Sequence, residues 1–128
     1  MNCHCGNPKP YTDCCQKAHH NIAEAKTAEQ LMRSRYSAFV LANGDYLMAT
    51  HHASTRPIKE KKAIVNWAKS VKWIKLEVLE TSEGQENDTK GTVTFNAYFF
   101  ENGKVDVIHE KSAFARENKH WYYLGHSK

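Results

Sequence analysis

The spacing of apolar residues changes along the chain, from a helical period in the first half to a strand period in the second. Between residues 28 and 42, apolar side chains recur every three or four positions, which is typical of one buried helix face. Thr27 is a good N-cap for this segment, and either Asn43 or Gly44 can take the left-handed conformation that ends a helix. We therefore predict a long helix over 28–42 and two shorter ones over 45–50 and 59–69.

From residue 73 onward, apolar and polar residues alternate, as they do in strands with one buried face. The predicted strands cover residues 73–80, 92–100, 105–116 and 120–124. The pair Asn102-Gly103 is a strong signal for a tight hairpin, and the polar segment 81–90 is predicted to be a loop. Helices followed by a run of antiparallel strands favour an α+β fold, with the helices packed on one face of a curved sheet.

Composition and charge narrow the class of protein. A chain of 128 residues is long enough for one domain and a small appendage. Its net charge of +4 is spread along the chain, which favours solubility and makes nucleic-acid binding an unlikely function. No apolar run approaches the roughly 18–20 residues of a membrane helix, and the first residues do not resemble a signal peptide. We therefore expect a cytoplasmic protein that does not enter a membrane.

The clearest chemistry lies in the cysteines, which all fall near the start of the chain, at Cys3, Cys5, Cys14 and Cys15. In the reducing cytosol, clustered thiols are typical of metal ligands, and four thiolates satisfy the tetrahedral preference of structural zinc. Iron is a possible second metal. A disulfide from one early to one late cysteine is the alternative after oxidation, and His4, His19 and His20 are nearby substitutes as ligands. A segment this short cannot build a core, so a bound metal would supply most of its folding energy.

The run from Cys3 to Cys15 resembles the SEC-C motif, the zinc-binding tail of the preprotein translocase motor ATPase. It has the initial Cys-x-Cys-Gly and the later tyrosine of that motif, but it ends in Cys-Cys rather than Cys-His and has Pro8 where glycine is usual. In the ATPase the motif engages a secretion chaperone and the ribosome. By analogy alone, the resemblance implies a protein partner of this kind.

The segments 27–39 and 110–114 are similar to the signature of the YchJ-like family, UPF0225, whose bacterial members are uncharacterised in function. Together the resemblances imply an NTF2-like cone over residues 23–128, preceded by a short metal-binding motif over residues 1–22, which we call the knuckle. NTF2-like domains often dimerise through the sheet, so the resemblance also implies a possible homodimer.

One arginine of the predicted long helix indicates where a pocket could lie. Arg35 falls in the middle of the apolar stripe, where an arginine either extends to solvent or meets a buried acceptor. Glu110 is the best candidate acceptor if its strand face points inward, so we predict an Arg35–Glu110 ion pair between helix and sheet. Such a pair either only fixes the packing or forms the polar floor of a concave pocket. The side chains expected near this pocket are Arg35, Tyr36, His52, Trp67, Glu110, Trp121 and Tyr123.

Three functions remain open on these grounds. The first is an adaptor or binding protein that is not an enzyme, with the knuckle as an interaction surface and the NTF2-like domain binding a partner or a small molecule. The second is a small-molecule enzyme, an isomerase or hydrolase, with an open cavity lined by His52 and Glu110. The third is a redox or metal-delivery protein. The spacing of residues identifies no catalytic residue.

Overall fold

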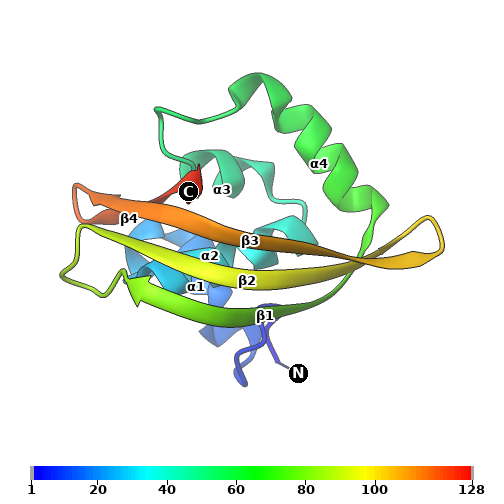
Figure 1. Cartoon of the computed structure of the whole chain (residues 1–128), viewed down its shortest axis with the longest axis horizontal. Coiled ribbons are helices and arrows are strands. Elements are labelled where there is room, and N and C mark those ends of the chain that lie inside the picture. The colour runs from blue at the N-terminus through cyan, green and yellow to red at the C-terminus, as the bar shows by residue number, and fades with distance from the viewer. Residues whose placement is uncertain (1, 128) are drawn as a thin grey trace.

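Helices occupy the first half of the chain and an antiparallel sheet the second half in the computed structural model, which describes residues 2–127 (Figure 1). The helices are α1 (Cys15–His20), α2 (Ala28–Val40), α3 (Gly44–Ala49) and α4 (Lys61–Ser70), and 3-10 turns lie at Tyr11–Asp13, Ile22–Glu24 and Ile58–Glu60. The strands are β1 (Lys72–Glu83), β2 (Lys90–Glu101), β3 (Lys104–Glu117) and β4 (His120–His126), side by side in that order. The predicted α+β fold is confirmed.

Helix α2 begins as predicted but ends differently. The Oγ1 atom of Thr27 accepts a hydrogen bond of 3.1 Å from the backbone N–H of Gln30, which satisfies an unpaired donor of the first turn. At the other end, Ala42 rather than Asn43 or Gly44 takes the left-handed conformation, with φ 54°. The side chain of Asn43 instead accepts from the backbone N–H of Tyr46 and so caps α3. Among the described residues, no helix is long and apolar enough to span a membrane.

The predicted hairpin between β2 and β3 is confirmed. Asn102 and Gly103 both have positive φ, at 53° and 80°, which is the conformation that a tight two-residue hairpin turn requires. β1 and β2 run further than expected, so the loop that joins them covers only residues 84–89.

Strand β1 carries two irregularities that break its alternation. Its pairing with β2 shifts register near Trp73 and again between Val78 and Glu80. Such bulges bend a strand and increase its twist. Leu79 lies within the second bulge and is 48% exposed, which explains why it interrupts the apolar–polar pattern of the sequence.

The helices cover one face of the curved sheet, and the main core lies between the two layers (Figure 1). Leu31 on α2, Phe114 on β3 and Trp121 on β4 are each at most 1% exposed. The knuckle cysteines form a second, smaller buried cluster with Tyr11. The division of the chain after residue 22 stays a prediction.

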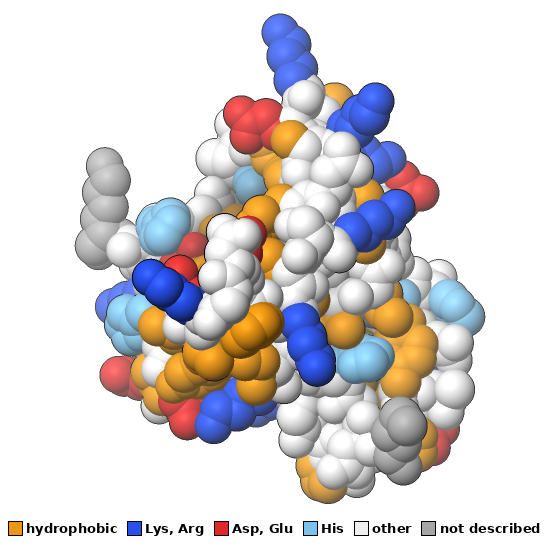
Figure 2. Space-filling view, turned by 90° about the vertical axis from the view of Figure 1, so that its right-hand side faces the viewer, with side chains coloured by type: hydrophobic (Ala, Val, Ile, Leu, Met, Phe, Trp, Pro, Cys, Tyr) orange, Lys and Arg blue, Asp and Glu red, His pale blue; other side chains and the backbone are white. Residues whose placement is uncertain are grey.

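The outer face of the sheet carries apolar side chains at the end near the β2–β3 hairpin. Phe100 and Val105 are partners across these strands and are 42% and 64% exposed, and Val107 lies further along the same face. Figure 2 looks at this side of the molecule and shows hydrophobic side chains gathered there, with charged groups around them. The homodimer expected from the resemblance stays a prediction.

Candidate metal centre and ligand cavity

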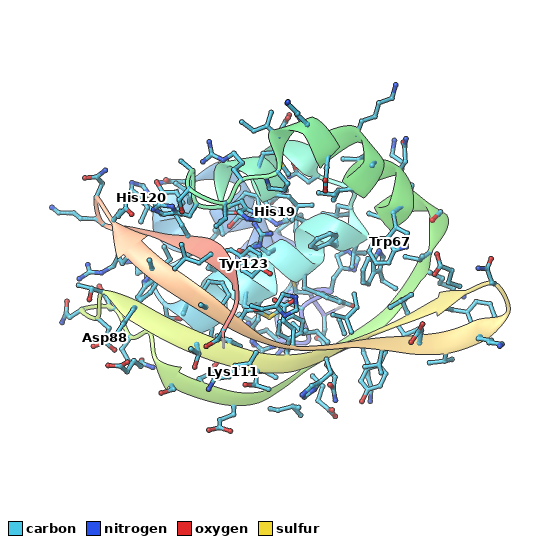
Figure 3. All side chains as sticks on the ribbon, turned by 45° about the horizontal axis from the view of Figure 1, so that its top comes forward. His19, Trp67, Asp88, Lys111, His120 and Tyr123 are labelled. Carbon is cyan, nitrogen blue, oxygen red and sulfur yellow. The ribbon has the colours of Figure 1, made fainter. Side chains whose placement is uncertain are left out.

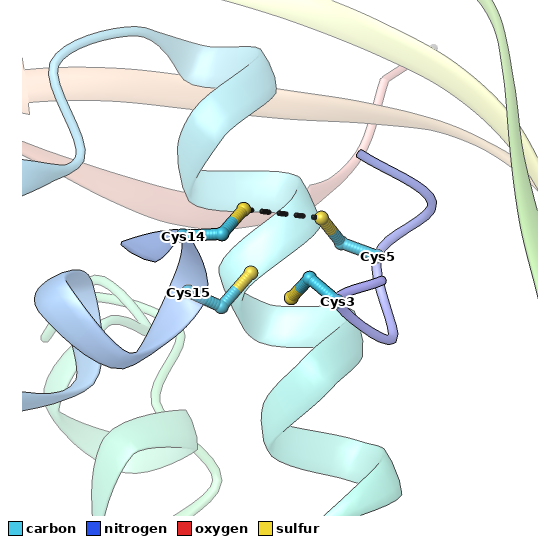
Figure 4. Close-up of side chains that lie close together, drawn as sticks. All are labelled: Cys3, Cys5, Cys14 and Cys15. Carbon is cyan, nitrogen blue, oxygen red and sulfur yellow. Dashed lines mark hydrogen bonds between the residues drawn. The ribbon is translucent and has the colours of Figure 1, made fainter. Parts of the chain in front are cut away.

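The four cysteine sulfurs form a compact group. All of their Sγ atoms lie within 4.8 Å of one another, and those of Cys5 and Cys14 are 3.6 Å apart (Figure 4). Zinc–sulfur bonds of about 2.3 Å in a tetrahedron would place the sulfurs about 3.8 Å apart. The four thiols are free of disulfide bonds. The cluster therefore fits a tetrahedral metal ion with small adjustments.

Two short pieces of backbone bring the ligands together. Gly6 has a φ of 95°, and its N–H donates to the carbonyl of Cys3 at 3.1 Å, which turns the chain back after the first two cysteines. The N–H of Cys3 donates to the carbonyl of Lys9 at 2.6 Å and closes this loop. The other two cysteines meet it from the start of α1, since Cys15 is the first residue of that helix.

Hydrogen bonding within the cluster changes the acidity of the thiols. The Cys15 thiol donates to the sulfur of Cys5, and this lowers the pKa of Cys5 to about 5 although burial opposes the shift. The same bond raises the pKa of Cys15, because its proton is held by the neighbouring sulfur. A thiolate is the form of cysteine that binds metals, and a cation bound beside it would release the remaining protons.

The loop that carries Cys3 and Cys5 is held against α2. The Nη1 atom of Arg33 donates to the carbonyl of Cys5 at 2.6 Å, while its Nε atom pairs with Glu29 one turn earlier at 2.9 Å. The sulfur of Cys3 lies 3.6 Å from the hydroxyl of Ser37 on the same helix. The cysteine cluster is therefore packed on α2, which appears behind it in Figure 4.

A second connection runs through His19, which Figure 3 labels among the helices. Its Nε2 atom donates to the carbonyl of Ser34 on α2 at 2.7 Å, so its Nδ1 atom accepts from the hydroxyl of Tyr11 at 2.7 Å. The ring also packs against Tyr46 on α3, with centroids 4.5 Å apart. Because both ring nitrogens are engaged, His19 acts as a link between knuckle and helix rather than as a substitute ligand.

A cavity of about 310 Å³ lies between the helices and the sheet. Its apolar walls are formed by Met32, Tyr36, Phe39, Leu47, Met48, Pro57, Ile64, Trp67, Trp73, Phe95, Ala97, Ile108 and Phe114. Its polar side is formed by Arg35, His51, Glu110, Ser112 and Tyr123. Figure 3 labels Trp67 on α4 and Tyr123 on β4, two side chains that line this space from different layers of the fold.

Arg35 does not pair directly with Glu110 within residues 2–127, so the predicted ion pair is wrong. Its Nη1 atom donates to the carbonyl of Leu47 at 2.9 Å and to the hydroxyl of Thr50 at 2.8 Å. These acceptors lie at the C-terminal end of α3, where unpaired carbonyls favour a cation. The guanidinium carbon lies 4.5 Å from the centroid of the Tyr123 ring, and that residue joins the arginine to the glutamate.

Glu110 is fixed by three side chains. Its Oε2 atom accepts from the hydroxyl of Tyr123 at 2.8 Å and from the hydroxyl of Ser112. Its Oε1 atom lies 3.2 Å from the Nε2 atom of His126, whose side chain is 76% exposed while that of Glu110 is 11% exposed. One carboxylate oxygen of Glu110 is therefore held by two hydroxyls, and the other contacts only a side chain that is largely exposed.

Burial sets the protonation of the other polar groups in the cavity. It lowers the pKa of Arg35 to about 10 and, together with the charge of that arginine, lowers the pKa of His51 to about 4. Burial and the hydrogen bond to Glu110 raise the pKa of Tyr123. At neutral pH, Arg35 is therefore charged, while His51 and Tyr123 are neutral.

The structure brings five of the side chains expected near the pocket together around the cavity, and it places two elsewhere. Those that line it are Arg35, Tyr36, Trp67, Glu110 and Tyr123. Whether they bind a ligand stays a prediction.

His52 and Trp121 are corrections to the expected set. His51 pairs with Tyr123 and lines the cavity, so the next residue points away, and His52 contacts Ser54 and Glu117 instead. Trp121 shares a strand face with Tyr123 but lies further from the cavity, where its Nε1 atom donates to the carbonyl of Lys26 at 3.1 Å.

The expected set left out most of the residues that line the cavity, among them His51, Trp73 and Ser112. Ser112 was detectable, because it lies two positions from Glu110 on the same strand face. His51 was not, because two adjacent histidines give no sign of which one faces inward.

Comparisons with known proteins agree with this architecture. Residues 27–126 match the family described as YchJ, middle NTF2-like domain. A UPF0225 protein of Vibrio parahaemolyticus is 44% identical over 123 residues, which cover 96% of this chain and 72% of that protein. A UPF0225 protein of Bordetella pertussis is 42% identical over 124 residues, covering 95% and 89%.

Two solved structures are similar along almost the whole chain. The solution structure of a SEC-C motif containing protein from Rhodopseudomonas palustris has a TM-score of 0.85 and 34% identity, covering 99% of this chain and 98% of that one. The crystal structure of a SEC-C motif containing protein from Psychrobacter arcticus has a TM-score of 0.84 and 34% identity, covering 100% and 84%.

Proposed function

Because this chain belongs to the YchJ family, UPF0225, with its NTF2-like domain, we propose that it is a ligand-binding protein whose cavity holds a small molecule. The observation that carries this proposal is the cavity of about 310 Å³ with its apolar walls and one polar side. Small-molecule sites in proteins are typically hollows of about 300–1,000 Å³ with mainly apolar walls and a few polar groups that orient the ligand.

The polar groups support binding better than catalysis. A general base works best with a pKa near the working pH, and the pKa of His51 is lowered to about 4. The pKa of Tyr123 is raised, which makes its hydroxyl a weak acid. Glu110 is already held by Tyr123, Ser112 and His126. These groups are arranged to hold a fixed pattern of donors and acceptors rather than to transfer a proton.

We propose zinc as the metal of the cysteine cluster, with iron as the alternative. Four thiolates at tetrahedral spacing suit either ion, and zinc is the usual occupant of closed structural sites of this type. Its role would be structural, since three of the four cysteines are buried and the knuckle is hydrogen-bonded to α2 through Arg33 and His19. Metal content of the reduced, tag-free chain measured by native mass spectrometry tests this, and absence of any bound metal would refute it.

The ligand-binding proposal is tested with two neighbouring residues of β3 that face opposite ways. Ile108 lines the cavity, whereas Val107 is 44% exposed on the other face of the sheet. We expect Ile108→Trp to fill the cavity and abolish the binding of small aromatic molecules, and Val107→Trp to leave it unchanged. Binding is followed by chemical-shift changes in the ¹⁵N-labelled full chain. Equal binding by both variants, or none by the wild type, would contradict the proposal.

A second candidate function is that of an adaptor whose knuckle binds a protein partner. It is supported by a polar groove of about 190 Å³ beside the cysteine cluster, lined in part by Lys9, Cys14 and Lys17. The partner suggested by the motif is a secretion chaperone or the ribosome. Co-sedimentation of the metal-loaded full chain with each of them, compared with the variant Lys9→Glu/Lys17→Glu, tests this candidate. Absence of co-sedimentation of the wild type with both would refute it.

A further inference from the structure

The polar side of the cavity carries one fixed positive and one fixed negative group. Arg35 is held by Leu47 and Thr50, and Glu110 is held by the hydroxyls of Tyr123 and Ser112. The ring of Tyr123 lies against the guanidinium and its hydroxyl donates to the carboxylate, so it joins the two charges. Their sum is zero, and His51 adds no charge at neutral pH.

A charged ligand would disturb this balance. An anion would bring a second negative group close to Glu110, and a cation would bring a second positive group close to Arg35. In either case, one buried charge in the occupied cavity would lack a partner, because Arg35 and Glu110 already balance one another. Unpaired charges in a mainly apolar site are strongly disfavoured, whereas an uncharged molecule incurs no such penalty. The electrostatics of the cavity therefore favour a neutral ligand.

Glu110 offers the clearest open acceptor to such a ligand. Its Oε2 atom is occupied by Tyr123 and Ser112, while Oε1 has His126 as its partner within the described chain. The side chain of His126 is 76% exposed, so it can leave Oε1 at little cost. A hydroxyl or N–H group of a ligand can then donate to this oxygen, and a buried carboxylate accepts such a bond strongly.

The opposite walls determine the rest of the ligand. Trp73 packs edge-on against Tyr36 and Trp67, with ring centroids 5.7 Å and 5.4 Å apart. All three rings line the cavity and offer flat apolar surfaces. The volume of about 310 Å³ lies at the lower end for small-molecule sites, which suits a molecule with one or two rings.

From these four features we propose that the cavity selects an uncharged, mainly apolar ring compound that carries a hydroxyl or N–H group, and that Glu110 accepts the hydrogen bond from that group. Arg35 has an indirect role, since its charge balances that of the glutamate. This inference rests on the proposed function, because it specifies the ligand class of the same cavity.

Three probes with the same ring system test the inference: 2-naphthol, which is neutral, 2-naphthoate, which is an anion, and 2-naphthylmethylamine, which is a cation near neutral pH. Dissociation constants for the full chain are measured by NMR titration. We expect 2-naphthol to bind at least about tenfold more tightly than either charged probe. Tighter binding of the anion or the cation would overturn the ligand class and leave the proposed function intact.

The variant Glu110→Gln provides an independent check, because it removes the negative charge and keeps the size of the side chain. With Arg35 no longer balanced, 2-naphthoate should bind at least about tenfold more tightly than it does to the wild type, while 2-naphthol should bind more weakly. Affinities for 2-naphthoate and 2-naphthol equal to those of the wild type would overturn the role of Glu110. If none of them binds the wild type more tightly than Ile108→Trp, the proposed function itself fails.

Discussion

Removal of the metal should unfold the knuckle and leave the sheet domain folded. The cysteine cluster and the main hydrophobic core are separate groups of buried residues, and of the described knuckle residues only Ala18 belongs to the main core, so unfolding of the knuckle leaves most of that core intact. The knuckle has too little apolar surface to fold without the metal. The perturbation is therefore chelation of the reduced wild-type chain, or the double variant Cys3→Ser/Cys14→Ser.

The magnitude of the effect on the domain follows from the bonds that the knuckle makes to α2. These are Arg33 to the carbonyl of Cys5 at 2.6 Å, His19 to the carbonyl of Ser34 at 2.7 Å, and Cys3 to Ser37 at 3.6 Å. At about 1 kcal/mol each, and less for the sulfur contact, they contribute about 2–3 kcal/mol to the stability of the domain. A domain of this size changes its melting temperature by about 4–8 °C per kcal/mol, so we expect a decrease of about 10–20 °C.

The assay combines thermal unfolding with two-dimensional NMR of the ¹⁵N-labelled chain. After chelation, signals of residues 3–20 should collapse to random-coil positions while those of β2 and β3 keep their dispersion. The double variant provides the control, because further addition of chelator should leave it unchanged. Loss of the sheet signals together with those of the knuckle would refute the reasoning, and so would an unchanged melting temperature.

Three further predictions concern single residues. Burial lowers the pKa of His51 from its ordinary 6.5 to about 4, so the unfolded chain binds a proton more readily than the folded one. The free energy of unfolding should therefore fall as the pH drops from 6.5 to 4. In denaturant titrations His51→Gln should weaken this pH dependence, and an unchanged slope of the free energy of unfolding against pH would contradict the prediction. Trp121 is 1% exposed and donates a hydrogen bond to the carbonyl of Lys26. Trp121→Phe should therefore lower the free energy of unfolding by about 2 kcal/mol. A change below about 0.5 kcal/mol would contradict its role in the core. Gly103 has a φ of 80°, and a Cβ atom added to it would meet no other atom within 4 Å. Gly103→Ala should therefore lower the free energy of unfolding by about 1 kcal/mol through backbone strain alone. An unchanged free energy of unfolding in the same denaturant titrations would contradict a left-handed turn.

The parts of the structure that could be predicted from the sequence are those fixed by local interactions. The cap at Thr27, the turn at Asn102-Gly103 and the alternation along β2 depend on residues that are neighbours in the chain. The cysteine cluster belongs to the same class, because its members lie within a short loop and the first turn of α1. A segment this short can bring its four cysteines together in only a few ways.

The parts that could not be predicted depend on contacts between distant segments. The ion pair expected between Arg35 and Glu110 was reasonable on polarity, but the end of α3 and the ring of Tyr123 compete for the guanidinium and prevail. Likewise, the choice of His51 over His52 for the cavity is set by the bridge to β4. No local sequence pattern indicates which of several polar groups will contact Arg35 or line the cavity once the helices pack on the sheet.

Helix α2 takes part in both sets of distant contacts, those of the knuckle and those of the cavity. One side of it, with Ser34 and Ser37, receives the knuckle, and another side, with Arg35 and Tyr36, faces the cavity. A helix of this length is marginal on its own, so its position depends on what packs against each side. A metal bound by the cysteines would therefore affect the cavity without touching it, by fixing the helix that carries Arg35.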